Sequence, residues 1–529
     1  MAPTEEGPGA PEARPGPDVP LDPTGNPLYD AILVGRERGD GQLLERADGS
    51  TLDDADFLAL AGRYANVLLD AGVGPGDRVA VQVSKSPEAL ALYVACVRAG
   101  AVFLPLNTAY TERELAYFVG DAEPAALVVD PADESLGGRL VAGTLARVLT
   151  LGADGGGSLA EHAVDVDAMD GAVPRAVDDL AAILYTSGTT GRSKGAMLTQ
   201  DNLLSNARTL VRAWAFTPRD VLLHALPIFH THGLFVACHT TLLSGARMIF
   251  LPGFDVDEVL AALPRASVLM GVPTFYTRLL DEPRFERSLA NGVRLFVSGS
   301  APLLAATHQA FEARTGQRIL ERYGMTETNM NCSNPYAGER VAGTVGPPLP
   351  GVEIRVRDDG GRDVPNGEVG TLEVRGPNVF AGYWRMPEKT AEELLPDGYF
   401  VTGDLATVDD AGYVTIVGRG KDLVISGGYN IYPREIEMAL DAVDGVLESA
   451  VVGAPHGDLG EGLVAFVVSD ASAEGRALDE KGITRALEES LARFKRPRRV
   501  VLVDALPRNT MGKVQKAELR GRVADVFAT

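Results

Sequence analysis

The sequence predicts an α/β protein with a large N-terminal region of layered sheets, a small β-subdomain and a small mobile α+β C-terminal domain. From about residue 30 to residue 251, helical patterns alternate with short β-branched runs, which is typical of mostly parallel sheets. After Gly343, alternating strands separated by Gly-rich turns replace this pattern. With 529 residues, the chain is also too long for one hydrophobic core.

In the first region, we expect strands at "DRVAVQV" (Asp77–Val83) and "AALVVD" (Ala125–Asp130). Between them, "EALALYVACVRAGAVF" predicts a helix that leads into a further strand. "SVLMGVP" (Ser267–Pro273) and "VRLFVSGSAP" (Val293–Pro302) each predict a strand, a Gly/Pro turn and a helix. Because ligands of such sheets bind at the carboxyl ends of strands, both turns are predicted to line a pocket.

The C-terminal half is predicted to contain two parts, a small antiparallel sheet and a compact domain. "VEIRVRDD", "GTLEVRG" and "GYVTIVGR" predict a small antiparallel sheet. Beyond Gly420, the strand "DLVISGG", the helix "PREIEMALDAV", strands around "ESAVVGAP" and "GLVAFVV", and the helix "KGITRALEESLARF" predict a compact domain. We therefore expect a disordered Pro/Gly-rich tail at residues 1–25, a large domain at residues 26–420 and a small domain at residues 421–529.

The composition excludes several classes of protein. The net charge of −23 and the pI near 4.8 argue against non-specific binding to nucleic acid or anionic membranes, so an anionic substrate needs a locally basic pocket. No apolar run is long enough to span a bilayer, and the N-terminus lacks the features of a signal peptide. Cys96, Cys238 and Cys332 fit neither a disulfide framework nor a zinc site. We expect a cytoplasmic protein with small-molecule partners.

The stretch "LYTSGTTGRSKGAMLT" (Leu184–Thr199) is the first segment that indicates a ligand-binding site. Its glycines let backbone N–H groups approach a ligand, its hydroxyls add donors, and Arg192 and Lys194 supply charge. That combination suits a phosphate chain. It is not a Walker A loop, because Lys194 comes one position late and is followed by Gly195 instead of Ser or Thr.

Further segments contain polar residues at positions where a hydrophobic core would not require them. They are "ERYGMTET" (Glu321–Thr328), which we expect to follow a strand, "TGD" before Leu405, "GRGKDLVISGGYNIYPREIE" and "LPRNTMGKVQK" (Leu506–Lys516). Each alone is consistent with a turn, a cap or a solvated loop. In this order and spacing, they resemble the acyl-adenylate-forming enzymes, which include the acyl-CoA synthetases, from about Asp30 to Gln515. Within that family, "PIFHTHGL" and "GVPTFYTRLL" are most similar to malonyl-CoA synthetases.

The resemblance implies how ATP and Mg²⁺ would be bound. The loop from Thr186 to Gly195 would wrap the β- and γ-phosphates, and Lys194 would neutralise the departing pyrophosphate. Thr186 and Glu327 would hold Mg²⁺, a hard cation that prefers oxygen ligands. The residues implied in binding ATP or coenzyme A are Thr186, Ser187, Gly188, Thr189, Thr190, Gly191, Lys194, Ser300, Ala301, Pro302, Tyr323, Gly324, Met325, Thr326, Asp404, Arg419, Ser426, Gly427 and Gly428.

In the same resemblance, Tyr323 and the turn Gly299–Pro302 would enclose adenine, and Asp404 and Arg419 would contact the ribose. Lys513 would bridge the substrate carboxylate and the α-phosphate as charge builds there. The residues implied in catalysis are Lys513, Thr186, Glu327 and His230.

The resemblance also implies two half-reactions. A carboxylate attacks ATP to give acyl-AMP and pyrophosphate, and the thiol of coenzyme A then displaces AMP. The small domain would rotate about Lys421 between the halves, and Ser426, Gly427 and Gly428 would line the thiol tunnel. Acetylation of Lys513 by a lysine acetyltransferase would remove its charge and switch the enzyme off.

The identity of the acid depends on one helix. Phe275, Arg278 and Leu279 share a face by their spacing, and an arginine there is explained either by snorkelling or by a bidentate pair with a second carboxylate of the substrate. The second explanation predicts a dicarboxylic acid such as malonate or methylmalonate. Ser298, His230 and Met325 would complete this acyl pocket.

Two alternatives remain at this stage. The first is a coenzyme A ligase for a short- or medium-chain monocarboxylic acid, with Arg278 on the surface. The second is a stand-alone adenylation enzyme that loads a carrier protein. A fused carrier is not expected, because 16 residues (529 − 513) follow Lys513.

Overall fold

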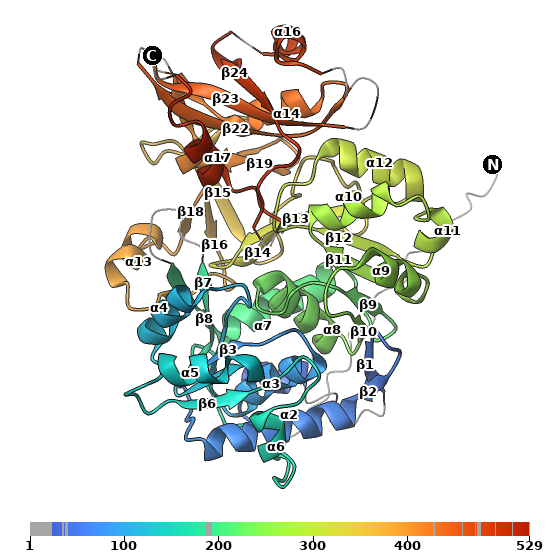
Figure 1. The fold of residues 1–529 in the computed structure, drawn as a ribbon, viewed down its shortest axis with the longest axis vertical. Helices are drawn as coiled ribbons and strands as arrows, with labels where there is room; N and C mark the ends of the chain where they lie inside the picture. The colour runs from blue at the N-terminus through green and yellow to red at the C-terminus, as the bar shows by residue number, and fades with distance from the viewer. Residues whose placement is uncertain are drawn as a thin grey trace, which may run out of the picture.

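The computed structural model describes residues 24–527 apart from residues 34–35, 37–40, 187–192, 427–428, 458, 471, 473–474, 476–477, 492 and 510–511. Most of the predicted tail therefore lies outside the described residues. Within the described part, the chain forms four sheets: two large ones that carry the N-terminal region, a small antiparallel one, and one in the C-terminal domain (Figure 1).

The first large sheet has eight described strands and is parallel through its centre. Its two edges are antiparallel, which makes the sheet mixed. Its order is β14 (Asn329–Ser333), β13 (Leu320–Met325), β12 (Leu295–Ser298), β11 (Val268–Gly271), β9 (Val221–His224), β10 (Arg247–Phe250), β1 (Gln42–Arg46) and β2 (Thr51–Asp53).

The second large sheet has seven described strands. The strands predicted at residues 77–83 and 125–130 are its parallel neighbours β3 and β5. Its order is β17 (Gly382–Tyr383), β8 (Lys194–Thr199), β7 (Leu180–Thr186), β4 (Val102–Pro105), β3 (Arg78–Gln82), β5 (Ala126–Val129) and β6 (Arg147–Thr150).

One hydrophobic core joins the two large sheets and includes buried residues of the helices that pack against them. The clearest case is α3 (Pro87–Arg98), which begins at the N-cap Ser86 with Pro87 in its first turn and is buried along its length. The other helices of this region are α1 (Pro27–Ile32), α2 (Asp54–Asp70), α4 (Glu112–Ala122), α5 (Glu134–Leu140), α6 (Ser158–His162), α7 (Gln200–Ala213), α8 (His239–Leu243), α9 (Val256–Ala262), α10 (Pro273–Asp281), α11 (Arg287–Ala290) and α12 (Ala305–Thr315).

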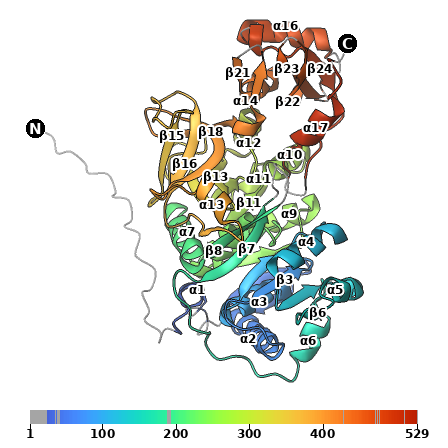
Figure 2. The same cartoon turned by 90° about the vertical axis from the view of Figure 1, so that its left-hand side faces the viewer.

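The predicted β-subdomain is an antiparallel sheet of β15 (Glu353–Arg357), β16 (Gly370–Arg375), β18 (Phe400–Val408) and β19 (Val414–Arg419). The C-terminal domain contains β20 (Val424–Ser426), β21 (Tyr429–Ile431), β22 (Val446–His456), β23 (Gly460–Ser469), β24 (Arg499–Leu502), α14 (Pro433–Asp441), α16 (Glu480–Ser490) and α17 (Lys516–Arg522). Figure 2 shows this domain and the small sheet together above the two large sheets.

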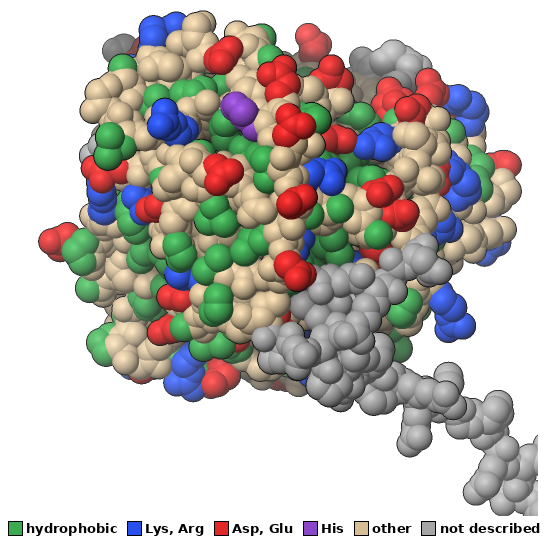
Figure 3. All heavy atoms as spheres, turned by 90° about the horizontal axis from the view of Figure 1, so that it is seen from below, with side chains coloured by type: hydrophobic (Ala, Val, Ile, Leu, Met, Phe, Trp, Pro, Cys, Tyr) green, Lys and Arg blue, Asp and Glu red, His purple; other side chains and the backbone are tan. Residues whose placement is uncertain are grey.

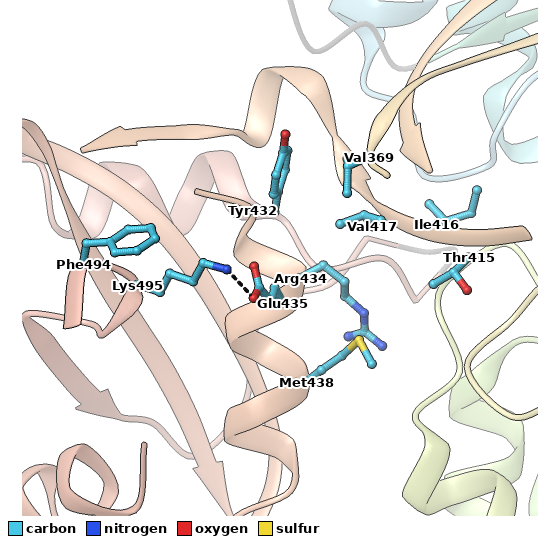
Figure 4. Close-up of a pocket in the computed structure, with 10 residues that line it drawn as sticks. All are labelled: Val369, Thr415, Ile416, Val417, Tyr432, Arg434, Glu435, Met438, Phe494 and Lys495. Atoms are coloured by element: carbon cyan, nitrogen blue, oxygen red, sulfur yellow. Dashed lines mark hydrogen bonds and ion pairs between the residues drawn. The ribbon is translucent and has the colours of Figure 1, made fainter. Parts of the chain in front are cut away.

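Separate cores divide the chain near the predicted boundary at residue 420. The core of the large region ends at Val414, and the two cores of the C-terminal domain begin at Val424. A groove of about 540 Å³ separates the two parts (Figure 4). It is lined by Val369, Thr415, Ile416 and Val417 on the sheet side and by Tyr432, Arg434, Glu435, Met438, Phe494 and Lys495 on the domain side.

The predicted α/β fold class is confirmed, with two local corrections. The segment "ERYGMTET" does not follow a strand: Glu321–Met325 lie within β13 itself. The last long helix, α16, ends at Ser490 and does not reach Phe494, because Leu491 takes an extended backbone conformation and packs into the domain core.

The surface is mixed in charge. On the face shown in Figure 3, acidic and basic side chains are interspersed, and no basic patch is seen there. Cys96, Cys238 and Cys332 are buried as free thiols. None of the described helices has the length and apolar character needed to cross a membrane.

Candidate active site

Three parallel strands end at one edge of the first large sheet. Gly271 of β11 pairs with Ser298 of β12, and Ser298 pairs with Glu321 of β13. The predicted turn Gly299–Pro302 therefore lies between the start of α10 and residues Tyr323–Met325. The sheet topology brings these predicted site residues together, in the position that α/β sheets use for ligands.

This edge is built with special backbone geometry. Ser300 has a φ of 72°, in the left-handed region that non-glycine residues seldom adopt, and its Oγ lies 3.3 Å from Nδ1 of His232. Gly324 leaves no room for a side chain, because a Cβ there would lie 1.9 Å from the carbonyl oxygen of Asn329. Backbone atoms without projecting side chains can pack against a flat ring. The predicted contact with adenine requires such a surface.

Asp404 joins this edge from the small antiparallel sheet. It is 3% exposed, and its Oδ2 accepts a hydrogen bond of 2.5 Å from the hydroxyl of Tyr323. Its Oδ1 lies 2.9 Å from Nε of Arg419, its neighbour across the β18–β19 pair. The predicted ribose contacts are thus already next to the predicted adenine contact. Burial and the charge of Asp404 hold the pKa of Tyr323 well above its usual value, so the phenol stays a donor.

The predicted phosphate loop connects the hairpin of β7 and β8. Thr186 ends β7 and pairs with Lys194 at the start of β8, with its Oγ1 donating to the carbonyl oxygen of Lys194 at 3.4 Å. Residues 187–192 of the predicted loop, which include Ser187, Gly188, Thr189, Thr190 and Gly191, lie outside the described residues.

Lys194 contacts two residues that the sequence analysis missed. Its Nζ is 3.1 Å from Oε2 of Glu393, at the end of α13 (Pro387–Glu393), and 4.0 Å from the centre of the Tyr383 ring. The hydroxyl of Tyr383 lies 2.6 Å from Glu393 Oε2 and 3.1 Å from Glu327 Oε1. Only the pairing of β17 with β8 brings these residues to Lys194, and no phosphate-binding pattern in the sequence marks them.

Glu327, the predicted Mg²⁺ ligand, is a buried carboxylate at 5% exposure. Burial raises its pKa, and the nearby charges of Lys194 and Arg419 offset this only in part. Mg²⁺ commonly binds through one or two carboxylates together with substrate phosphates. A buried carboxylate beside a phosphate loop therefore fits this cation.

Lys513 lies on the segment of the C-terminal domain that precedes α17, close enough to Asp404, Glu327 and Arg419 of the large region for their charges to act on it. A Cβ on the adjacent Gly512 would lie 3.4 Å from Oγ1 of Thr274, at the start of α10. The surrounding protein and the charge of Arg419 lower the pKa of the Lys513 ammonium, while Asp404 raises it. Lys513 itself is exposed to solvent, so its loss of hydration is partial.

His230 precedes the π-helix η3 (His232–Cys238), whose residues are all buried. Burial and the charges of Lys513 and Arg322 lower the pKa of His230 to about 3, so its imidazole is neutral at physiological pH. The deeper His232 and His224 also have pKa values well below the usual one because of burial. A neutral His230 is compatible with the predicted role in shaping the acyl channel, and His232 is in contact with Ser300.

Buried neutral histidines predict a loss of stability in mild acid. Below pH 6.5 the unfolded chain takes up protons that the folded chain excludes, so the free energy of unfolding should fall as the pH falls. For His239, whose pKa burial lowers to about 3, the loss at pH 5 is about 2 kcal/mol, at 1.36 kcal/mol per pH unit below 6.5. Urea unfolding at pH 5 and pH 7.5 measures it.

The variant His239→Gln should show a smaller difference between the two pH values than the wild type, by about that amount. His162→Gln is the control, because His162 is exposed and should leave the difference unchanged. An equal pH effect in wild type and His239→Gln would contradict the prediction.

The residues predicted to select the acid lie in different surroundings. Ser298 is fully buried, Met325 is half-buried at the end of β13, and Arg278 is exposed on α10. Arg322, which the sequence analysis did not single out, is buried within β13. A charged residue inside a strand with buried neighbours was the signal that could have identified it.

The remaining predicted residues lie at the domain boundary. Lys421 belongs to the short 3-10 turn η5 (Gly420–Asp422) between β19 and β20. Ser426 ends β20 and is buried, whereas Gly427 and Gly428 lie outside the described residues. Ala301, Pro302 and Thr326 lie on the edge described above.

Comparisons with known proteins show the family to which this chain belongs. Residues 36–384, more than half of the chain, match the family described as "AMP-binding enzyme", and residues 435–513 match "AMP-binding enzyme C-terminal domain". Among solved structures, the chain is 56% identical to MatB from Rhodopseudomonas palustris, over 95% of this chain and 100% of that one. The TM-score is 0.92 with ATP-bound MatB and 0.83 with apo MatB. This chain is therefore closer in arrangement to the ATP-bound form.

Two other relatives are similar over most of their length. A malonate–CoA ligase of Arabidopsis thaliana is 37% identical over 476 residues, which are 84% of this chain and 78% of that protein. A feruloyl-CoA synthase of an Amycolatopsis species is 37% identical over 485 residues, which are 90% of this chain and 95% of that protein. The chain belongs to the AMP-binding enzyme family and is an AMP-forming acyl-CoA ligase.

Proposed function

We propose that this ligase joins a small dicarboxylic acid, malonate or methylmalonate, to coenzyme A through an acyl-AMP intermediate, with ATP and Mg²⁺. One observation carries the proposal of the first half-reaction. Lys513 of the C-terminal domain lies within electrostatic reach of Asp404, Glu327 and Arg419 of the large region. This proximity supports a role for Lys513 as the cation at the predicted nucleotide site.

In the first half-reaction, a substrate carboxylate oxygen attacks the α-phosphorus, and the bond to pyrophosphate breaks. Lys513 is proposed to stabilise the charge that develops between the carboxylate and the α-phosphate. Lys194, now paired with Glu393, would turn to the leaving pyrophosphate. Asp404 and Tyr323 would hold the nucleoside in place.

Thr186 and Glu327 are proposed to hold Mg²⁺, which when bound supplies positive charge to the phosphate oxygens. Their positions support this. Thr186 is the last residue of β7 before the predicted phosphate loop, and the buried Glu327 contacts Tyr383, which in turn lies against Lys194 at the other end of that loop. The protein itself excludes water from Glu327 and fixes the orientation of its carboxylate. Tyr383 does this by donating to its carboxylate.

In the second half-reaction, the thiol of coenzyme A attacks the acyl carbon, a C–S bond forms, AMP leaves and the thiol proton passes to solvent. Ser426 is proposed to line the path of the thiol together with Gly427 and Gly428. The groove of Figure 4 supports a rotating small domain, because it leaves the contact between that domain and the small sheet incomplete.

The choice of malonate is supported by the 37% identity to a ligase named for that acid. The equal identity to a feruloyl-CoA synthase shows that overall similarity does not select the acid. A pyrophosphate-release assay with ATP, coenzyme A and a panel of acids tests the proposal. Malonate should give the highest kcat/KM. A higher value for butyrate or ferulate would refute it, and turnover only with a carrier protein in place of coenzyme A would favour the carrier-loading alternative.

Arg278 provides a direct test of selectivity. Arg278 is exposed in the ligand-free protein, so the proposal requires that the bound acid removes water from it; Arg278→Ala should then lower kcat/KM for malonate by at least about 30-fold, the lower bound for removing one partner of a desolvated charge pair. Activity with butyrate should hold or rise, and the KM for ATP should not change. Arg208→Ala, which removes an exposed arginine of α7, is the matched control. If the variant uses malonate as well as the wild type does, Arg278 is a surface residue that snorkels.

Acetylation of Lys513 by a lysine acetyltransferase and a cytoplasmic location stay predictions. The exposure of the Lys513 side chain supports access by a modifying enzyme.

A further inference from the structure

The segment that carries Lys513 folds back on itself before α17. Arg508 and Val514 form an antiparallel bridge, so the lysine lies on the returning arm of a tight hairpin. Leu506 is buried in a core of the C-terminal domain, and the partly buried Val514 packs against the same core. Lys513 itself is exposed. Its position therefore depends on the polar contacts of the hairpin more than on apolar packing.

Hydrogen bonds hold the peptide groups on both sides of Lys513. The N–H of Asn509 donates to the carbonyl oxygen of Lys513 at 3.0 Å, and the N–H of Lys513 donates to Oδ1 of Asn509 at 3.0 Å. Nη1 of Arg508 donates to the carbonyl oxygen of Gly512 at 2.6 Å. Two adjacent side chains thus fix the backbone from which the lysine projects.

Arg508 differs from Asn509 because it also reaches outside the hairpin. Its Nη2 forms an ion pair with Oε2 of Glu448 on β22, and both side chains are half-buried. Glu448 lies within the long antiparallel pair of β22 and β23. The planar guanidinium holds several donors in fixed directions, so one side chain can join a carboxylate and a carbonyl group. Arg508 therefore connects the sheet of the C-terminal domain to the carbonyl group just before Lys513.

We propose that Arg508 is a positioning residue for Lys513. Held by Glu448, its guanidinium fixes the Gly512 carbonyl group and with it the direction in which the Lys513 side chain leaves the hairpin. The inference rests on the proposed function, in which Lys513 stabilises the charge that develops at the α-phosphate. Such stabilisation depends on a preorganised position, and a displacement of about 1 Å can cost on the order of 100-fold in rate.

Arg508→Met, which removes the donors and keeps a long side chain, should lower kcat of adenylation by about 10- to 100-fold. Thioester formation from synthetic malonyl-AMP and coenzyme A should stay within about twofold of the wild type, because that step does not need Lys513. The KM for ATP should also stay within about twofold, since the predicted nucleotide contacts come from the large region. Arg508→Lys keeps the charge and should recover part of the adenylation rate. Pyrophosphate release measures that rate.

Two further variants show whether the contact itself matters. Glu448→Gln keeps the shape of the side chain and removes its charge, so it should give the same pattern as Arg508→Met with a smaller loss. Arg522→Ala is the matched control, because it breaks an exposed ion pair of 2.6 Å with Glu518 on α17. It should leave both half-reactions unchanged. A lower Tm for Arg508→Met together with equal losses in both half-reactions would assign Arg508 a structural role and overturn the inference.

A double-mutant cycle with Lys513→Ala tests the coupling directly. If Arg508 acts only by placing the lysine, its position no longer matters once the lysine is gone. Adding Arg508→Met to Lys513→Ala should then cost no further adenylation in a single-turnover assay at high enzyme concentration. Losses that simply add would mean that Arg508 acts independently of Lys513, and the inference would be wrong.

The outcomes also separate this inference from the proposed function. Full adenylation by Lys513→Ala refutes the proposed role of the lysine and with it the role of Arg508. A large loss in Lys513→Ala, with wild-type adenylation by Arg508→Met, refutes only the role of Arg508.

Discussion

Lys513→Ala should lose the first half-reaction by about 100- to 1000-fold and keep the second, since removing one preorganised donor at a site of developing charge costs on this scale. The ammonium is needed where charge builds between carboxylate and α-phosphate. It is not needed when the thiol attacks an acyl-AMP that is already formed. Pyrophosphate release measures the first half, and thioester formation from synthetic malonyl-AMP and coenzyme A measures the second.

Two further variants sharpen this test. Lys516→Ala removes another lysine of the same segment, one whose Nζ is 2.6 Å from Glu437 within the C-terminal domain, so it controls for changes in the fold of that domain. Lys513→Arg keeps a cation and should recover part of the adenylation rate. Full adenylation by Lys513→Ala would remove the assignment. Equal loss in both half-reactions would point to a damaged domain.

Lys421→Pro should spare adenylation and lower thioester formation by about 100-fold or more. Lys421 lies in the 3-10 turn η5, where φ is about −50° to −70°, and proline holds φ near −65°. Proline therefore fits the arrangement in which Lys513 meets the nucleotide site. It resists the change in backbone angles that a rotation of the small domain requires.

The same two assays measure this prediction, with Lys421→Ala as the control that removes the side chain and leaves the backbone free. Lys421→Ala should keep both half-reactions near the wild-type rate. If proline slows both halves alike, the substitution disturbs folding. If it slows neither, the hinge lies elsewhere between β19 and β20.

The sequence alone predicted the layered α/β class, the small antiparallel sheet and the family, because these depend on local patterns. Strand and helix periodicities, Gly-rich turns and a fixed order of motifs are all readable within short windows of the chain. The position of Pro273 at the start of α10 is one example, since a proline fits the first turn of a helix. Site residues at strand ends followed from the same logic.

Contacts between distant segments were decided by the tertiary structure. Glu393 and Tyr383 meet Lys194 because β17 pairs with β8, about 185 residues apart, and no local pattern encodes that pairing. Periodicity marked Arg278 as the notable arginine, yet burial depends on what packs over a face, and the fold buries Arg322 instead. Charge and hydration follow from burial, so the chemistry of the acyl pocket emerges only when β12, β13 and the His230 segment are brought together.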